Sequence, residues 1–291
     1  MNEAPTLPPT LGGQAVVEGV MIRGPKGTAV CVRNPDGEIV CHTELNAGAG
    51  PLRHVPVVRG VAALGETISQ GMRALVWSAQ VAAGRDPEEP SDTQIRTTSV
   101  VSLGFVAGLF LLMPALASQR LERRMKRNRF SGAVEGFLRI GTLLGYLRTV
   151  GRLPQAQRLF AYHGAEHRAI QAYEAGEPLS VESVRRYPNA HVRCGTSFLL
   201  TTAIFSSVIY TAIGPQSVGR RLLSRVLLTP VIAGLSYEAI RIASTSSSPI
   251  IALLFRPNLQ LQGLTTRDPD EGQMEVAIAA VQAALALHQG A

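Results

Sequence analysis

Charged side chains are scarce in this chain of 291 residues: Asp, Glu, Lys and Arg make up only 17% of it, against about 25% in an average soluble protein. Aromatic residues are also few, at 5%. The shortage of charge is concentrated in a few long apolar runs, which favours a membrane protein over a soluble domain. The net charge of +7 comes with little aromatic interleaving. It therefore predicts contact with anionic lipid and no nucleic-acid partner.

Cysteine is equally sparse. The chain has three, Cys31, Cys41 and Cys194, and their spacing excludes the disulfide framework of a small secreted domain. Cys31 and Cys41 flank an expected hairpin and could lie close together, but the prediction is free thiols in a reducing compartment. The first ten residues contain no apolar core, so no cleavable signal peptide is expected, and insertion into a membrane must depend on internal segments.

Short β-branched runs between turn residues predict a small β-rich module at the N-terminus. Residues 1–10 are rich in proline and are expected to be disordered, and residues 11–60 form the module. Within it, Thr28–Arg33 and Glu38–Thr43 are predicted strands joined by the turn sequence NPDG. Residues 61–96 then combine a polar linker with an amphipathic helix, which suits a membrane surface as well as a protein core.

Long apolar segments predict a membrane-associated helical domain in residues 97–258. Thr97–Ser118 has no charged residue, and Cys194–Gln216 contains a second uncharged run; about 20 apolar residues span a bilayer as a helix. Ser131–Gly151 is apolar but carries ionisable side chains, so it could span the bilayer, re-enter it or lie in the interface. Val226–Ser244 is also apolar but carries Glu238 and Arg241. Such side chains usually face the interior of a helix bundle.

The predicted fold is therefore mostly α-helical: a multi-pass membrane bundle with the small β-rich module before it and a C-terminal amphipathic helix in residues 259–291. The predicted orientation is contradictory. The basic stretch Gln119–Arg129 favours a cytoplasmic loop by the positive-inside rule. If Thr97–Ser118 spans the bilayer, the N-terminal module then lies outside, with no signal peptide to carry it. Three arginines in residues 185–193 favour a cytoplasmic position for their own segment, so one apolar segment could instead be re-entrant or interfacial.

The segment YHGAEHRAI carries the clearest chemical signal. His163, Glu166 and His167 form the pattern H-x-x-E-H, which also occurs in metal-dependent peptidases of the inverted-zincin type. Pro154 and Gly176 suit the start and the end of a helix around it. On that helix, two histidines four residues apart project from one face and can hold one cation. The alternative is an exposed polar helix face on which the histidines fall by chance.

Two further segments offer metal ligands. His191 and Cys194 in NAHVRCGTSF have a spacing common among ligand pairs, and they precede an apolar helix, which places them at the membrane surface. Cys194 taken alone suits a small buried hydrophobe at a helix start. Glu238 in LSYEAIR is a distant carboxylate of the kind that completes an inverted-zincin site, although an ion pair with Arg241 explains it equally well.

Five segments together resemble one family. They follow one another in the same order, cover roughly Leu11 to Leu285, and read GGQAVVEGVMIRG, YHGAEHRAI, HVRCGTSF, LSYEAIR and LTTRDPDEGQMEVAIAA. This pattern resembles the YqhQ-like family of bacterial membrane proteins, a domain-of-unknown-function family described as predicted metal-dependent enzymes. Two departures are small: the family usually has proline where Val192 stands and glutamate where Asp268 stands. The resemblance implies a metal-linked protein of the bacterial inner membrane and supplies no substrate.

The leading hypothesis is a membrane metal-dependent hydrolase that acts near the membrane surface on a peptide or lipid-linked substrate. Its cofactor would be a divalent metal, with zinc the first candidate, and Glu166 would orient a water molecule and accept its proton. The expected metal ligands are His163, His167, His191, Cys194 and Glu238. The rival hypothesis is a non-enzymatic membrane scaffold or transport protein with a structural metal or a buried polar network. Three protein ligands favour the enzyme, and four favour the scaffold.

Overall fold

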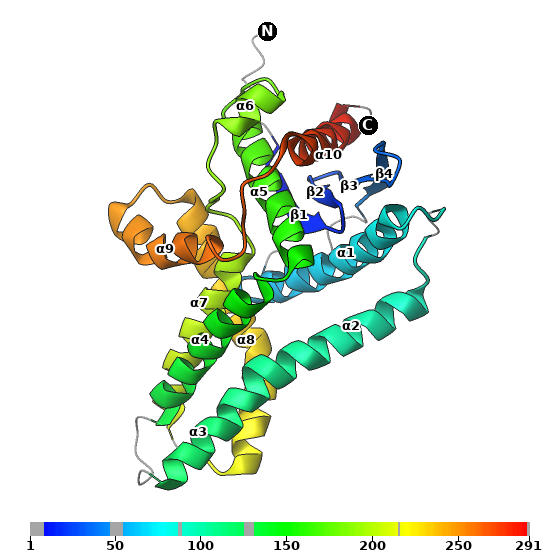
Figure 1. The fold of residues 1–291 in the computed structure, drawn as a ribbon. Helices are drawn as coiled ribbons and strands as arrows, with labels where there is room; N and C mark the ends of the chain where they lie inside the picture. The colour runs from blue at the N-terminus through cyan, green and yellow to red at the C-terminus, as the bar shows by residue number, and fades with distance from the viewer. Residues whose placement is uncertain (1–8, 47–54, 87–88, 125–130, 215, 290–291) are drawn as a thin grey trace.

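The computed structural model describes residues 9–46, 55–86, 89–124, 131–214 and 216–289. Figure 1 shows two parts, a small sheet packed among helices and a bundle of long helices that extends away from it. The expected combination of a mostly helical fold with a small N-terminal sheet is confirmed. The expected disorder of residues 1–10 falls largely outside the described residues.

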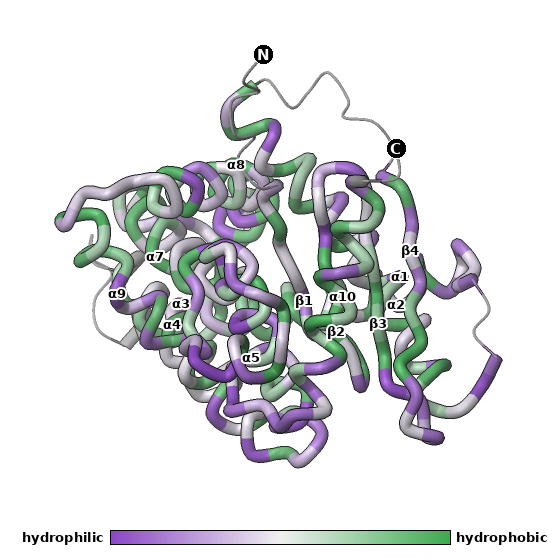
Figure 2. The backbone as a smooth tube through the Cα atoms, turned by 90° about the horizontal axis from the view of Figure 1, so that it is seen from above, coloured by the Kyte–Doolittle hydropathy of each residue, from purple (hydrophilic) through white to green (hydrophobic). Residues whose placement is uncertain are grey.

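Four antiparallel strands form the sheet, in sequence order: β1 (Gly12–Val16), β2 (Gly19–Arg23), β3 (Gly27–Arg33) and β4 (Ile39–Leu45). Successive side chains of a strand point to opposite faces, and here both faces are covered. One face packs on α1 (Val58–Ala82). The other packs on α5 (Pro154–Glu174) and α10 (Glu271–Gln289), and Figure 2 shows α5 beside β1 with α10 next to the middle strands. The core of the N-terminal module is therefore completed by the middle and the end of the chain.

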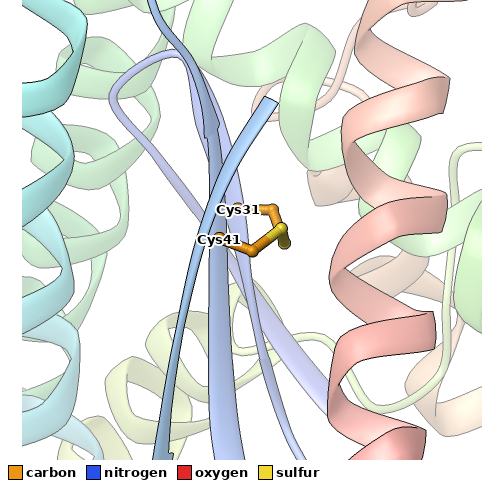
Figure 3. The surroundings of a disulfide bond; sticks show 2 residues. All are labelled: Cys31 and Cys41. Carbon is orange, nitrogen blue, oxygen red and sulfur yellow. A yellow bond between two sulfur atoms is a disulfide. The ribbon is translucent and has the colours of Figure 1, made fainter. Parts of the chain in front are cut away.

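Cys31 and Cys41 form a disulfide between β3 and β4 (Figure 3). The prediction of free thiols at these two positions is wrong. The register places the two residues directly opposite each other, with Cα atoms 4.1 Å apart, because the turn between the strands leaves both cysteines on the same face. Figure 3 shows the bond on the side of the sheet that faces α10. The third cysteine, Cys194, is free and buried.

The bundle consists of α3 (Met113–Arg124), α4 (Ser131–Val150), α7 (Thr196–Ile213) and α8 (Val218–Thr245). The π-helical turn η2 (Gly108–Leu112) joins α3 to α2 (Asp92–Ala107). Among the described residues, three stretches are long and apolar enough to cross a membrane, namely Asp92–Arg120, Thr196–Ile213 and Val218–Thr245. The two uncharged runs expected from the sequence lie in the first two of them, so apolar helices that could span a membrane are confirmed.

Figure 1 places the sheet and α5 at one end of the bundle, and the end of α3 and the start of α4 at the other. The basic stretch that begins at Gln119 and the arginines of residues 185–193 therefore lie at opposite ends. The two basic segments cannot both lie on the cytoplasmic side, as the positive-inside rule would require. This explains why the sequence predicts contradictory orientations. Residues 125–129 of the basic stretch lie outside the described residues.

A proline explains how α3 is tied to α4. Pro114 has no N–H, so the carbonyl oxygen of Phe110, four residues earlier, loses its donor within the helix. The Nε of Arg139 on α4 donates to this oxygen at 3.0 Å. The π-helical turn η2 contains Phe110, and such wide turns commonly accompany a break in the regular ladder.

Glu135 lies at the centre of a buried charged cluster. Its carboxylate accepts hydrogen bonds from Arg139 at 2.9 Å and from Arg225 at 3.0 and 2.5 Å, and Arg221 lies 4.0 Å away. All four side chains are at most 5% exposed. The guanidinium of Arg225 also lies 3.7 Å from the centre of the Tyr210 ring, in a cation–π contact. The expectation that the ionisable groups of Ser131–Gly151 face the bundle interior is met by Glu135 and Arg139.

The substitution Glu135→Ala should destabilise the chain by about 3–5 kcal/mol, because it leaves buried arginines without their shared counter-charge. Unfolding of the purified protein in detergent measures the effect. Glu275→Ala is the control, since Glu275 pairs with Arg33 at the surface and such pairs contribute at most about 1 kcal/mol. Equal losses from the two substitutions would show that the cluster does not hold the bundle together.

Candidate metal centre

Helix α5 carries the H-x-x-E-H pattern and has the predicted ends. It begins at Pro154, whose φ is already helical, and Gly176 follows its end with a φ of +70°, a conformation that favours glycine. Glu166 and His167 are only 3% and 1% exposed. The alternative of an exposed polar helix face is therefore wrong, and the pattern lies inside the protein.

Both histidine rings of α5 are held by main-chain carbonyl groups. The Nδ1 of His163 lies 2.8 Å from the carbonyl oxygen of Thr265, and the Nδ1 of His167 lies 2.5 Å from that of Asn189. A carbonyl oxygen can only accept, so each Nδ1 carries the ring proton and each Nε2 presents a lone pair. This is the arrangement in which histidine binds a metal through Nε2 while its other nitrogen fixes the ring.

Cys194 completes a group of three potential ligands. Its Sγ lies 3.2 Å from the Nε2 of His163, and the ligand atoms of His163, His167 and Cys194 all lie within 4.8 Å of one another. Tetrahedral zinc bonded at about 2.0 Å to nitrogen and about 2.3 Å to sulfur separates such atoms by roughly 3.3–3.8 Å. The donor types fit a divalent metal such as zinc, and the distance between Cys194 and His163 is close to that separation.

The buried environment of Cys194 disfavours its thiolate form when no metal is bound. Burial raises the pKa of its thiol, and the N–H of Thr196, 3.3 Å from the sulfur, acts in the opposite direction. Thr196 is the first residue of α7, so this N–H is one of the donors that a helix start leaves unpaired. A cation bound nearby would favour the thiolate further.

Glu166 lies beside this group. Its Oε2 is 3.5 Å from the Nε2 of His167. Burial raises the pKa of Glu166 to about 8, nearby His163 lowers it and Cys194 raises it further. For His167, burial lowers the pKa to about 3 and the neighbouring His163 lowers it as well. The imidazole of His167 is thus kept in the neutral form that binds metal.

Two glycines make room for these side chains. A Cβ atom at Gly13 in β1 would overlap the carboxyl group of Glu166, and one at Gly164 would overlap the carbonyl oxygen of Arg267. Gly164 therefore lets the segment after α9 (Pro249–Gln262) lie directly against α5, where Thr265 reaches His163. Sequence reasoning missed both roles, although GGQ and HGA are visible as glycine-containing motifs.

The loop that carries Cys194 is fixed from two sides. The side-chain amide of Gln262 accepts from the N–H of His191 and donates to its carbonyl oxygen, both at 2.9 Å. The side-chain oxygen of Asn189 accepts from Arg168 at 2.7 Å, and its NH₂ donates to Asp268 at 3.0 Å. This network holds the main chain that orients His167 and positions Cys194. The carboxylate of Asp268 is part of that network.

Two residues expected to bind the metal lie outside the group of three. The Nε2 of His191 lies 3.3 Å from a carboxylate oxygen of Glu174, and His191 lies outside the group of three. The carboxylate of Glu238 accepts from Arg59 at 2.6 and 2.5 Å and lies 3.8 Å from Arg241. The structure corrects the expectation for Glu238: this residue forms an ion pair, mainly with an arginine of α1.

Comparison with known proteins places the chain in a family. The sequence profile of the family described as "Protein of unknown function (DUF1385)" matches residues 55–287, most of the chain. The chain belongs to this family. It is also 33% identical over 290 residues to the "Uncharacterized protein YqhQ" of Bacillus subtilis (strain 168), a match that covers 94% of this chain and 91% of that protein. The resemblance expected from the motifs is confirmed. No solved structure matches the chain.

The substitution Gly164→Ala should weaken binding of Zn²⁺ by about 10- to 100-fold, because it displaces Arg267 and with it the carbonyl group that orients His163. Competition with a chromogenic chelator measures this affinity. Gly12→Ala is the matched control, since a Cβ there meets nothing within 4 Å, and it should bind Zn²⁺ like the unchanged chain. Unchanged affinity in Gly164→Ala would mean that the contact with Thr265 does not prepare His163 for a metal.

Proposed function

We propose that this protein is a membrane-bound, metal-dependent hydrolase. The observation that supports the proposal is the group formed by His163, His167 and Cys194, with the buried carboxyl group of Glu166 next to it. Three protein ligands leave one position of a tetrahedral metal open, which is typical of catalytic zinc sites. Two imidazoles and a thiolate are also a set that favours zinc over harder cations such as magnesium or calcium.

The residues of the chain have separate parts in this proposal. A divalent metal held by the three ligands supplies a Lewis acid that activates water and polarises a carbonyl or phosphoryl oxygen. The carboxyl group of Glu166 would accept a proton from that water and return it to the leaving group. Burial raises its pKa above the ordinary value of a carboxyl group, and a bound cation would act in the opposite direction. Thr265 and Asn189 hold the two imidazoles in the tautomer that faces the metal.

The location of the centre limits its substrates. Cys194 lies two residues before α7, a helix that is apolar and long enough to cross a membrane. This position supports a site at the membrane surface, and we propose that the protein is a multi-pass protein of the bacterial inner membrane. A peptide segment or a lipid-linked molecule at that surface is the substrate class that suits it.

One observation favours a second candidate function. The Oε2 of Glu166 is close enough to His167 that Glu166 could become a fourth ligand, and a closed set of four is typical of structural zinc sites. The protein would then be a membrane scaffold in which the metal fixes the loop before α7. The behaviour of Glu166 variants separates the two functions.

Alanine at His163, His167 or Cys194 should remove bound metal, since each deletes one of three ligands. Alanine at His191 and glutamine at Glu238 should leave the metal in place, because the structure puts both residues outside the group. Elemental analysis of the purified variants measures this directly. Metal that persists when both His163 and His167 are replaced would show that α5 holds no metal.

The substitution Glu166→Gln should keep the metal and lower hydrolysis by about 10²- to 10⁴-fold, the usual effect of losing a general base. Mass spectrometry of membranes from cells that produce either form would show cleavage products only with the unchanged chain. Loss of metal in Glu166→Gln would support the scaffold instead. Identical product profiles from both forms, with metal retained in both, would contradict the hydrolase.

A further inference from the structure

Helix α9 (Pro249–Gln262) carries an exposed apolar stripe. Ile250, Leu253 and Leu254 are 69%, 65% and 70% exposed. Their spacing of three and four residues places them on one face of the helix. Large apolar side chains that are this exposed and adjacent mark a surface that water does not cover in the functional protein.

The C-terminal end of α9 is buried and partly polar. Asn258 and Gln262 are 5% and 0% exposed. The side-chain NH₂ of Asn258 donates to the hydroxyl of Thr201 on α7 at 3.2 Å, and Gln262 holds the main chain of His191. A helix at a protein–water boundary has its polar face outward and its apolar face inward. In α9 the polar side chains of Asn258 and Gln262 are buried and large apolar side chains of its first half are exposed, which indicates an apolar medium around that first half.

The length and position of α9 indicate which part of a bilayer it contacts. Its 14 residues extend about 21 Å at 1.5 Å per residue, too short for a hydrocarbon core of about 30 Å. Figure 1 shows α9 running crosswise at the end of α7 and α8 that is nearest to α5. Pro257 lies within the helix, so the carbonyl of Leu253 loses its helical donor. Such a group needs another donor, which a neighbouring helix can supply within a bundle and water supplies at the interface.

We propose that α9 is an interfacial helix whose stripe of Ile250, Leu253 and Leu254 inserts into the lipid leaflet at the level of the metal centre. The stripe lies close to the exposed apolar surface of α8, where Ile242 is 56% exposed, and only Ser246–Ser248 separate the two helices. Exposed Arg256, on the same helix, suits the phosphate groups of the lipid headgroups. The leaflet surface then passes beside the loop that carries His191 and Cys194.

Depth-dependent fluorescence quenching tests this arrangement in the full chain. The protein is reconstituted in vesicles of phosphatidylcholine and phosphatidylglycerol that contain lipids brominated at either a shallow or a deep acyl position. Trp77, the single tryptophan, is replaced by Phe, and one new tryptophan is introduced at Leu253. The fluorescence of this tryptophan should be quenched mainly by the lipid with the shallow bromine.

Three matched positions calibrate the result. Tryptophan at Val208, exposed in the middle of α7, should be quenched mainly by the deep bromine, and tryptophan at Gln282, exposed on α10, by neither. Tryptophan at Val192, beside the metal ligands, should respond weakly and only to the shallow bromine. These readouts need no metal and no activity, so they stay valid if the proposed function fails.

Two results would overturn the proposal. Emission from position 253 that neither bromine quenches would mean that lipid does not cover the stripe; if the chain is then a dimer by light scattering, a second copy covers it. Quenching at position 253 that matches the deep profile of position 208 would place α9 in the hydrocarbon core and not at the interface.

Discussion

The candidate site depends on two main-chain carbonyl groups that fix the imidazoles of His163 and His167. A neutral buried histidine can present its Nε2 lone pair only if its Nδ1 proton has an acceptor. Thr265 and Asn189 provide the two acceptors from two loops that lie against α5. Gly164 allows the first loop to lie against the helix, and Gln262 holds the second through His191. Much of the fold around α5 thus serves to bring these two loops to one helix face.

Burial of charge is handled in two different ways in this molecule. In the bundle, arginines surround Glu135 and hydrogen bonds fill its carboxylate, so the charges stay and compensate one another. At the candidate site no arginine is in hydrogen-bond contact with Glu166 within the described residues, and burial raises its pKa to about 8. The cluster around Glu135 stabilises one arrangement of the bundle helices. The arrangement at the candidate site leaves a carboxyl group that can gain or lose a proton near neutral pH, as a general base requires.

Local sequence signals predicted much of the candidate site. The remaining features depend on contacts between residues far apart in the sequence, which the sequence alone does not reveal. The spacing of His163 and His167 fixes their common face once α5 is a helix, and the His191–Cys194 segment was singled out by ligand spacing. Glu238 was a reasonable candidate by residue type, but only the tertiary fold shows that Arg59 of α1 reaches it. The disulfide was missed because it depends on the register of β3 and β4. Neither Gly13 nor Gln262 could be assigned, since each acts on a residue far away in the sequence.

The N-terminal sheet is part of the candidate site and not a separate module attached to it. Gly13 of β1 lies where a larger residue would displace the carboxyl group of Glu166, so the strand covers the proposed base and shields it from bulk solvent. Gly13 lies before residue 55, where the match to the family profile begins, while the similarity to the Bacillus subtilis protein covers nearly the whole chain. The raised pKa of Glu166 is mainly a consequence of burial. The proton transfer proposed for Glu166 on α5 therefore depends on burial by β1, a strand near the N-terminus.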